Sequence, residues 1–169
     1  MRRIKYMILS CVIILTSSVP ATASVGSSYK KYRNDKNISK YRYVDIDQNG
    51  VKEMVFATEA DDSAICGVCT YKNKKVVCLA SIKLGKYYPY VYYSKNRKKF
   101  ALITSNSASA MCKIYKLTNG KAKLVKTMNY QRQPSRDYKF YINGIESTEE
   151  KYHEAENVLD NWKKIDLRK

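Results

Sequence analysis

Residues 63–68 read SAICGV and residues 109–114 read SAMCKI, so a serine-alanine pair, an apolar residue and a cysteine recur in one order. The two cysteines lie 46 positions apart, and at that offset MVFA at 54–57 falls on FALI at 100–103. A strand, a polar loop and a cysteine-bearing hairpin therefore occur twice, with a period close to that of one propeller blade. Because two units cannot close a propeller ring, we expect an open, stacked or sandwiched arrangement.

Around these segments, short runs rich in Val, Ile and Tyr are separated by Asn, Gly, Lys and Ser, which is typical of successive antiparallel strands. Asn119-Gly120 and Asn143-Gly144 each follow such a run, and this dipeptide tolerates the positive φ angles of a tight hairpin turn. The predicted strands are Tyr41–Val44, Glu53–Thr58, Ile65–Tyr71, Val76–Ile82, Tyr88–Tyr93, Phe100–Thr104, Met111–Leu117, Ala122–Met128 and Tyr138–Ile142.

The end of the chain changes from strand to helix periodicity. Ser147 and Glu150 form a capping box, and a helix is predicted from about Thr148 to Lys163. Its apolar stripe, at helical spacing, consists of Tyr152, Ala155, Leu159 and Trp162. The predicted fold class is therefore mainly β (α+β): antiparallel blade-like sheets in two related units, about 41–86 and 87–132, then a hairpin and a helix at 138–163 that packs on the sheet.

The first 23 residues have the features of a secretory signal peptide. Basic residues precede a short apolar stretch, Tyr6–Leu15, and the small residues Ala21-Thr22-Ala23 form a cleavage pattern. We expect a secreted, extracellular or cell-wall-associated protein with no membrane span after processing. Residues 24–40 form a basic polar arm, either loose or a short helix, and residues 41–169 a single β-rich domain.

The charge balance is strongly basic. The whole chain carries a formal net charge of +17, and removal of residues 1–23 with their three basic side chains leaves +14 over 146 residues. The positive charge is spread along the chain, so the surface attracts polyanions without discriminating among them. The partner classes that fit are an anionic extracellular polymer, a glycan or a protein, with nucleic acid also compatible. Solubility alone is the competing explanation of this charge.

The most informative stretch is DIDQNGVKE at residues 45–53. Polar oxygens alternate along it, and Gly50 permits the sharp turn that makes them converge, as the six to eight oxygen ligands of calcium require. The predicted ligands of one calcium ion are the side chains of Asp45, Asp47, Asn49 and Glu53 and the carbonyl of Val51. The alternative is an Asp- and Asn-rich turn stabilised by its own hydrogen bonds.

This loop resembles the calcium loops of FG-GAP and VCBS-type repeats, in which D-x-D-x-[DN]-G-x-x-[DE] precedes an apolar strand; here Met54-Val55-Phe56 follows. It is also similar to loops in small uncharacterised secreted proteins of Gram-positive bacteria. The resemblance implies a structural calcium site at the start of a blade strand, and brings no enzymatic activity with it. At the corresponding place in the second unit stand Val91, Tyr93 and Lys95, which lack carboxylates.

Four cysteines remain after residues 1–23, and an even count in an oxidising compartment predicts two disulfides. In a hairpin that turns at Asn73-Lys74, Cys69 faces Cys78 at a separation that suits a disulfide. Cys66 and Cys112 are then left as the second pair. Cys66 and Cys69 also form a C-x-x-C sequence, but no second such pair supplies a zinc half-site.

Tyrosines crowd one basic segment, and we consider Tyr88, Tyr90, Tyr92, Arg97 and Lys98 as binding residues for sugars or bases. Tyrosine also suits half-exposed strands without any ligand. The lone histidine, His153, and the lack of a nucleophile elbow or phosphate-binding glycine loop favour a non-enzymatic binding or structural module. The alternative function is a small secreted carboxylate-dependent hydrolase or toxin-like enzyme that uses acidic pairs such as Asp61-Asp62.

Overall fold

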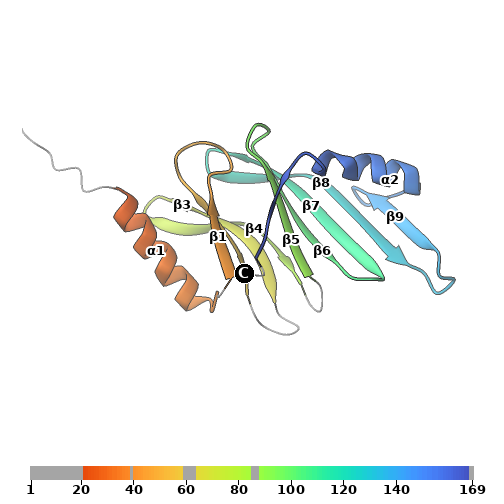
Figure 1. The fold of residues 1–169 in the computed structure, drawn as a ribbon, viewed down its shortest axis with the longest axis horizontal. Coiled ribbons are helices and arrows are strands. Elements are labelled where there is room, and N and C mark those ends of the chain that lie inside the picture. Colours follow the sequence, from red (N-terminus) through yellow and green to blue (C-terminus); the bar gives the residue numbers. More distant parts are fainter. Residues whose placement is uncertain (1–20, 39, 59–63, 85–87, 168–169) are drawn as a thin grey trace, which may run out of the picture.

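The structure, a computed structural model, describes residues 21–38, 40–58, 64–84 and 88–167. Its backbone forms two antiparallel sheets with a helix at each end of the molecule (Figure 1). The signal-peptide prediction falls mostly on residues 1–20, which lie outside the described ranges. Residues predicted as a loose arm or short helix contribute most of α1 (Ala21–Asp35).

The first sheet has four strands in the order β1-β2-β3-β4. Each strand pairs antiparallel with its sequence neighbour, as in a single meander. Its strands are β1 (Lys40–Val44), β2 (Glu53–Ala57), β3 (Ile65–Lys72) and β4 (Lys75–Lys83). This sheet corresponds to the first predicted unit.

The second sheet has seven strands in the order β10-β9-β8-β7-β6-β5-β11. Its centre is a second meander, which corresponds to the second predicted unit: β5 (Tyr88–Ser94), β6 (Lys99–Ser105), β7 (Ser109–Thr118) and β8 (Lys121–Arg132). Three shorter strands complete the sheet: β9 (Tyr138–Ile142), β10 (Ile145–Ser147) and β11 (Lys163–Ile165). The fold is thus mainly β with two antiparallel sheets, as the strand pattern predicts.

The two meanders share a detail of their backbone. The register between β3 and β4 shifts at Val68/Cys69, which leaves Leu79 as an extra residue on β4. Between β7 and β8 the shift is at Ile114/Tyr115, with Val125 as the extra residue. The two shifts lie 46 positions apart in the chain, which is the spacing of the sequence repeat. An identical bulge at equivalent places indicates that the two units are built on one backbone plan.

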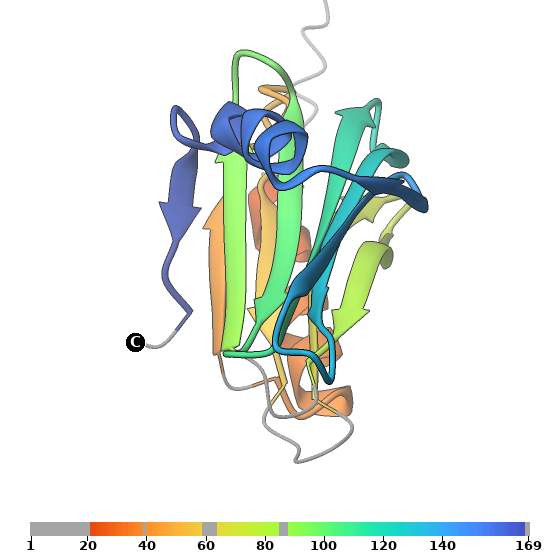
Figure 2. The ribbon, with the colours of Figure 1, turned by 90° about the vertical axis from the view of Figure 1, so that its right-hand side faces the viewer.

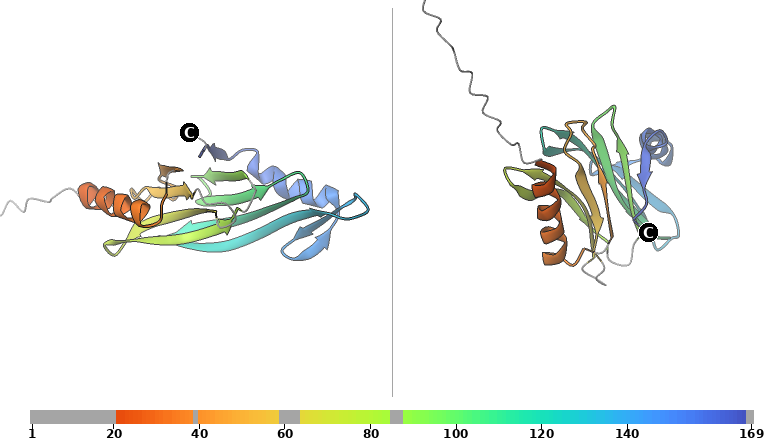
Figure 3. Two further views of the ribbon diagram at one scale, coloured as in Figure 1. Left: turned by 90° about the horizontal axis from the view of Figure 1, so that it is seen from below. Right: turned by 60° about the vertical axis from the view of Figure 1, so that its left-hand side comes forward.

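Three buried clusters show how the elements are layered. One contains Val55 and Val68 of the first sheet with Phe100 and Leu102 of the second, so the two sheets face each other. A second cluster places Tyr29 of α1 against the other face of the first sheet. The third packs the C-terminal segment on the far face of the second sheet. The order is therefore α1, first sheet, second sheet, α2, and the two helices lie at opposite ends (Figure 3).

The C-terminal helix is shorter than predicted. The helix α2 spans Glu149–Glu156, a 3₁₀ turn, η1, follows at Asn157–Leu159, and the chain then returns as β11 beside β5 (Figure 2). The predicted cap is also wrong by one residue, because Thr148 rather than Ser147 caps the helix and accepts a hydrogen bond from the Lys151 amide. Ser147 ends β10 instead.

The predicted apolar stripe nevertheless contacts the sheet. Tyr152, Leu159 and Trp162 are buried in the cluster beneath α2, and Ala155 packs against it. Burial of these side chains, rather than a continuous helix, holds this segment in place.

Candidate metal centre

The acidic loop connects β1 to β2 at one end of the sandwich. The side chain of Ile46 is fully buried in the cluster between the sheets, so the loop is held by its own apolar residue. Gln48 and Gly50 have φ angles of 59° and 84°, and these left-handed conformations fold the backbone back on itself. The loop is therefore a compact turn rather than a free excursion.

Asp45 organises the backbone of this turn. Its two carboxylate oxygens accept hydrogen bonds from the amides of Asn49 at 3.2 Å and Gly50 at 3.1 Å. Asn49 in turn accepts a hydrogen bond from the Val51 amide at 2.7 Å. These are the local hydrogen bonds expected of an Asp- and Asn-rich turn, so that part of the alternative interpretation is present in the structure.

Glu53, the first residue of β2, has no exposed surface. One of its oxygens accepts a hydrogen bond from the Ile46 amide at 2.9 Å, and the other accepts one from the Thr70 hydroxyl at 3.1 Å. Burial raises the pKa of Glu53 to about 7, although these two hydrogen bonds lower it. The nearby charge of Asp47 adds to the rise. An anionic Glu53 here needs further compensation.

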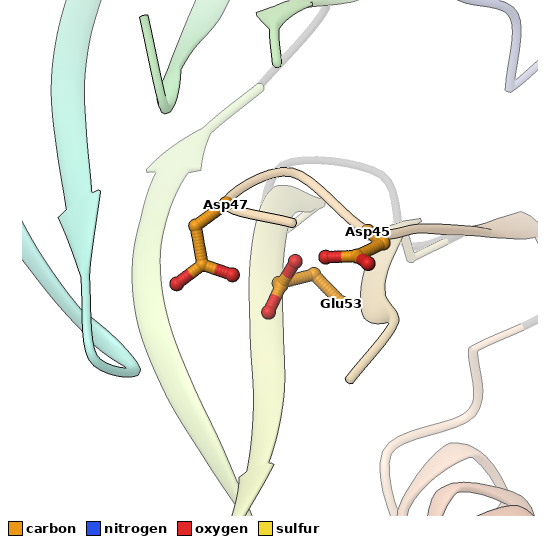
Figure 4. A group of neighbouring side chains, drawn as sticks. All are labelled: Asp45, Asp47 and Glu53. Carbon is orange, nitrogen blue, oxygen red and sulfur yellow. The ribbon is translucent and has the colours of Figure 1, made fainter. Parts of the chain in front are cut away.

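The three carboxyl groups of Asp45, Asp47 and Glu53 lie together (Figure 4). One oxygen from each lies within 4.8 Å of the others. Calcium holds its oxygens at about 2.3–2.6 Å, so one ion can reach all three at this separation. Asp47 is only 3 % exposed, and its Oδ1 is buried without a hydrogen-bond partner among the described residues.

Hydrogen bonds satisfy the carboxylate oxygens of Asp45 and Glu53, but they do not satisfy the buried Oδ1 of Asp47. A buried carboxylate oxygen without a partner costs free energy, and two further carboxylates beside it add repulsion. A cation removes both costs at once. The acidic group can therefore hold a metal ion, as the sequence predicts for its three carboxylates. The side-chain oxygen of Asn49 accepts a hydrogen bond from the Val51 amide, and the ligand roles of Asn49 and of the Val51 carbonyl stay predictions.

Two residues that support the loop were not predicted to do so. Thr70 lies on β3 and anchors Glu53, as described above. Tyr29 of α1 is buried, and its hydroxyl donates a hydrogen bond to the Lys52 carbonyl at 2.9 Å. The loop is thereby connected to α1 and to β3. No pattern in the sequence links Tyr29 to the loop, because the two are brought together only by tertiary packing.

The cysteine hairpin has the predicted register. Cys69 pairs with Cys78, Thr70 with Val77 and Tyr71 with Val76. The Cys69 thiol donates a hydrogen bond to Cys78, which lowers the pKa of Cys78 to about 7 and raises the pKa of Cys69. Both cysteines are free thiols in the structure.

The second predicted pair is not brought together. Cys66 lies in the cluster between the sheets, whereas Cys112 lies in the cluster beneath α2. Both are buried free thiols, and burial raises the pKa of each to about 12. The two positions are equivalent in sequence but face different layers, because β3 and β7 belong to different sheets.

The predicted binding residues occupy one strand and the turn that follows it. Tyr88, Tyr90 and Tyr92 lie on β5, and Arg97 and Lys98 lie in the next turn. At about 3.3 Å per residue, Tyr88 is roughly 20 Å from the end of β5. Tyr92 packs on the cluster beneath α2, and the Lys164 ammonium lies 4.1 Å from the centre of the Tyr90 ring. A binding role for these five residues stays a prediction.

Two other expectations concern acidic residues and the histidine. Asp61-Asp62 lies outside the described ranges. His153 lies on the exposed side of α2, between Glu149 at 3.7 Å and Glu156 at 3.3 Å. These are surface pairs of adjacent helical turns, and they do not form a nucleophile system.

No family model, curated protein or solved structure matches the chain. Within the described ranges, no helix is long and apolar enough to cross a membrane.

Proposed function

We propose that this chain is a secreted, non-enzymatic binding or structural module that holds one calcium ion in an FG-GAP/VCBS-like loop and presents a basic surface to an anionic extracellular partner. The observation that carries the proposal is the acidic group of Asp45, Asp47 and Glu53, with its buried, unpartnered Asp47 oxygen. The basic surface follows from the net charge, which is +17 for the whole chain and +14 without residues 1–23.

The donor set favours calcium over other ions. Its side chains offer carboxylate oxygens, and the neighbouring Asn49 adds an amide oxygen; hard oxygen ligands of this kind suit calcium and magnesium. Magnesium demands near-ideal octahedral geometry and retains water, whereas calcium accepts a flexible loop. The loop, with its two left-handed residues, suits calcium better.

A bound ion would connect several layers of the fold. Glu53 bonds to Thr70 on β3, and Lys52 bonds to Tyr29 on α1. A cation that fixes the loop therefore stabilises the junction of α1 and the first sheet, which is a structural role. Catalysis is less compatible with the site, because Glu53 has no exposed surface and both of its oxygens accept hydrogen bonds.

The cross-strand pair of Cys69 and Cys78 fits a secreted module. The two thiols face each other in register, so oxidation in an extracellular compartment would close a disulfide across the hairpin beside Thr70. We propose this single disulfide and leave Cys66 and Cys112 as buried thiols.

Thermal unfolding of the purified chain from residue 24, with calcium and with a chelator, tests the calcium half of the proposal. Calcium at about 100 times its dissociation constant should stabilise the fold by about 2.7 kcal/mol. Loss of this gain in Asp47→Asn without a fall in the melting temperature of the chelated protein supports a structural ion. Identical melting curves with calcium and with chelator contradict it.

Binding to an anionic polymer at increasing salt tests the other half. A partner held by the basic surface should dissociate steeply as salt rises. Salt-independent binding, or none at low salt, contradicts the electrostatic part.

A further inference from the structure

Three lysines stand side by side on three neighbouring strands of the second sheet, near the ends of these strands. Lys99 of β6 pairs directly with Lys116 of β7, and Lys116 pairs directly with Lys123 of β8. Directly opposed residues of antiparallel strands point to the same face, with Cβ atoms about 4.5–5.5 Å apart. We call Lys99, Lys116 and Lys123 the lysine row. Lys116 and Lys123 are exposed, and Lys99 is half-buried.

More positive charge flanks the row on the same face. Side chains alternate along β7, so Lys116 shares its face with Ile114, whose partner on β8 is Lys126. Thr118, two residues beyond Lys116, pairs with Lys121. The described residues of the row form no ion pair with other described residues.

Two acidic residues on this side of the sheet lie away from the row. Glu156 and Asp160 border a hollow with Tyr92 and Ile103 at the end of α2. Ile103 is four residues along β6 from Lys99, which corresponds to about 13 Å. Glu156 and Asp160 therefore do not neutralise the lysine row.

Such a row costs stability. Like charges directly opposite each other on a sheet repel, whereas opposite charges would stabilise the same positions. Lysine on edge strands protects a sheet from aggregation, but β6, β7 and β8 are all interior strands of the second sheet. Edge protection therefore does not explain these three residues, and a partner with negative charge does.

We infer that the lysine row binds the phosphate groups of an extended, phosphate-bearing polymer. This inference rests on the proposed function and locates its anionic partner on the molecule. Neighbouring strands are about 4.8 Å apart, so the row is about 10 Å long, and one extended chain can contact all three ammonium groups. Ammonium groups recognise phosphate as point charges.

The chemistry of the row favours a charge contact over recognition of sugars or bases. Binding of bases or sugars through their rings uses aromatic side chains on which the ligand stacks. The residue of β5 that pairs with Lys99 is Ser94, so no aromatic residue stands in line with the lysine row on β5. On this face, Tyr92 of β5 packs on the cluster beneath α2. The polymer is therefore recognised by its repeated charge.

The test compares two triple variants that lose the same charge. K99Q/K116Q/K123Q removes the lysine row, and K36Q/K83Q/K151Q removes three exposed lysines on α1's flank, β4 and α2. Binding of a labelled long-chain inorganic polyphosphate is measured by fluorescence anisotropy over a range of salt concentrations. We expect the row variant to bind about tenfold more weakly, with a salt slope lower by about 2, and the control variant to change less than about threefold.

A second readout separates binding from folding. Because the row is repulsive, K99Q/K116Q/K123Q should melt at the same temperature as the wild type or higher, so weaker binding cannot be attributed to unfolding. Equal losses of polyphosphate affinity in both variants would show that the lysine row is not the binding site, while the proposed basic binding surface would stand. Absence of wild-type binding to polyphosphate and to phosphatidylglycerol vesicles overturns both, and binding to the vesicles alone replaces the polymer with a membrane surface.

Discussion

The first two strands of each unit are joined in different ways. Between β1 and β2 lies the acidic loop of residues 45–52, whereas β5 and β6 are joined by a tight turn at residues 95–98. The equivalents of Asp45 and Asp47 are Val91 and Tyr93, which lie within β5 and pair with β6. The equivalent of Glu53 is Lys99, the first residue of β6.

This difference shows that the meander does not need the acidic loop to form. Both units keep the same strands and the same bulge, although only one contains a group of carboxylates. The second unit uses a short basic turn whose charges remain in water. The first unit instead buries acidic side chains that could hold a metal ion. The loop is therefore an addition to a scaffold that forms without it.

The largest contrast is expected at the equivalent residues Glu53 and Lys99. Glu53→Ala leaves the buried Ile46 amide without its acceptor and removes one ligand of the ion, so we expect a loss of about 3–5 kcal/mol in calcium. Lys99→Ala should change stability by no more than about 0.5 kcal/mol. Urea unfolding of both variants measures the difference, and equal effects would remove the distinction between the two units.

Asp47→Asn separates the charge of the loop from its shape. The substitution keeps the side chain's size but removes a buried negative charge without a partner. We expect a calcium affinity at least tenfold lower, and therefore a loss of at least about 1.3 of the roughly 2.7 kcal/mol that calcium at 100 times the wild-type dissociation constant provides. Without calcium the variant should be as stable as the wild type or more so. Melting curves with and without calcium measure both effects, and an unchanged calcium response would show that Asp47 is not a ligand.

The cysteine hairpin provides a third contrast. Cys69 and Cys78 have Tyr115 and Leu124 as their equivalents, which are also directly paired. Only the first unit can form a disulfide there. Closing this short loop should stabilise the oxidised protein by about 2 kcal/mol over the reduced protein. Mass spectrometry of protein purified without reductant, with Cys78→Ser as control, should show that the wild type has two hydrogens fewer than its reduced form. An oxidised Cys66–Cys112 pair would contradict the layering of the two sheets.

The last expected effect is on pH dependence, and it is comparable in size with that of the disulfide. The folded protein without calcium raises the pKa of Glu53 to about 7 from an ordinary value of 4.5, so the folded state binds this proton more tightly than the unfolded state does. Stability of the chelated protein should therefore fall by about 2 kcal/mol as pH rises from 5 to 7. Calcium binds the ionised form of Glu53. The stability that calcium adds should therefore increase as pH rises from 5 to 7. Unfolding at several pH values, with calcium and with chelator, measures both trends. Glu53→Gln should abolish the fall in stability of the chelated protein.

Local patterns were sufficient to predict much of this fold. The alternation of apolar residues and the Asn-Gly turns place most strands, because these signals depend on neighbours in sequence. The register of the cysteine hairpin follows from its turn at Asn73-Lys74. The acidic group also follows from spacing, since its residues belong to one loop.

What could not be predicted depends on contacts between distant segments. The α2 helix stops early because the following residues pair with β5 as β11, and no local signal marks that pairing. The separation of Cys66 from Cys112 results from the packing of the two sheets, which places equivalent residues in different layers. The supporting role of Tyr29 and the alignment of Lys99, Lys116 and Lys123 likewise require the tertiary structure.

Isothermal titration of chelator-stripped protein with calcium, alongside Asp47→Asn, tests the central claim most directly. We expect saturable heat at one ion per chain for the wild type, and at least tenfold weaker binding for the variant. Absence of heat and of calcium uptake by the wild type at neutral pH would show that the three carboxylates are not a calcium site.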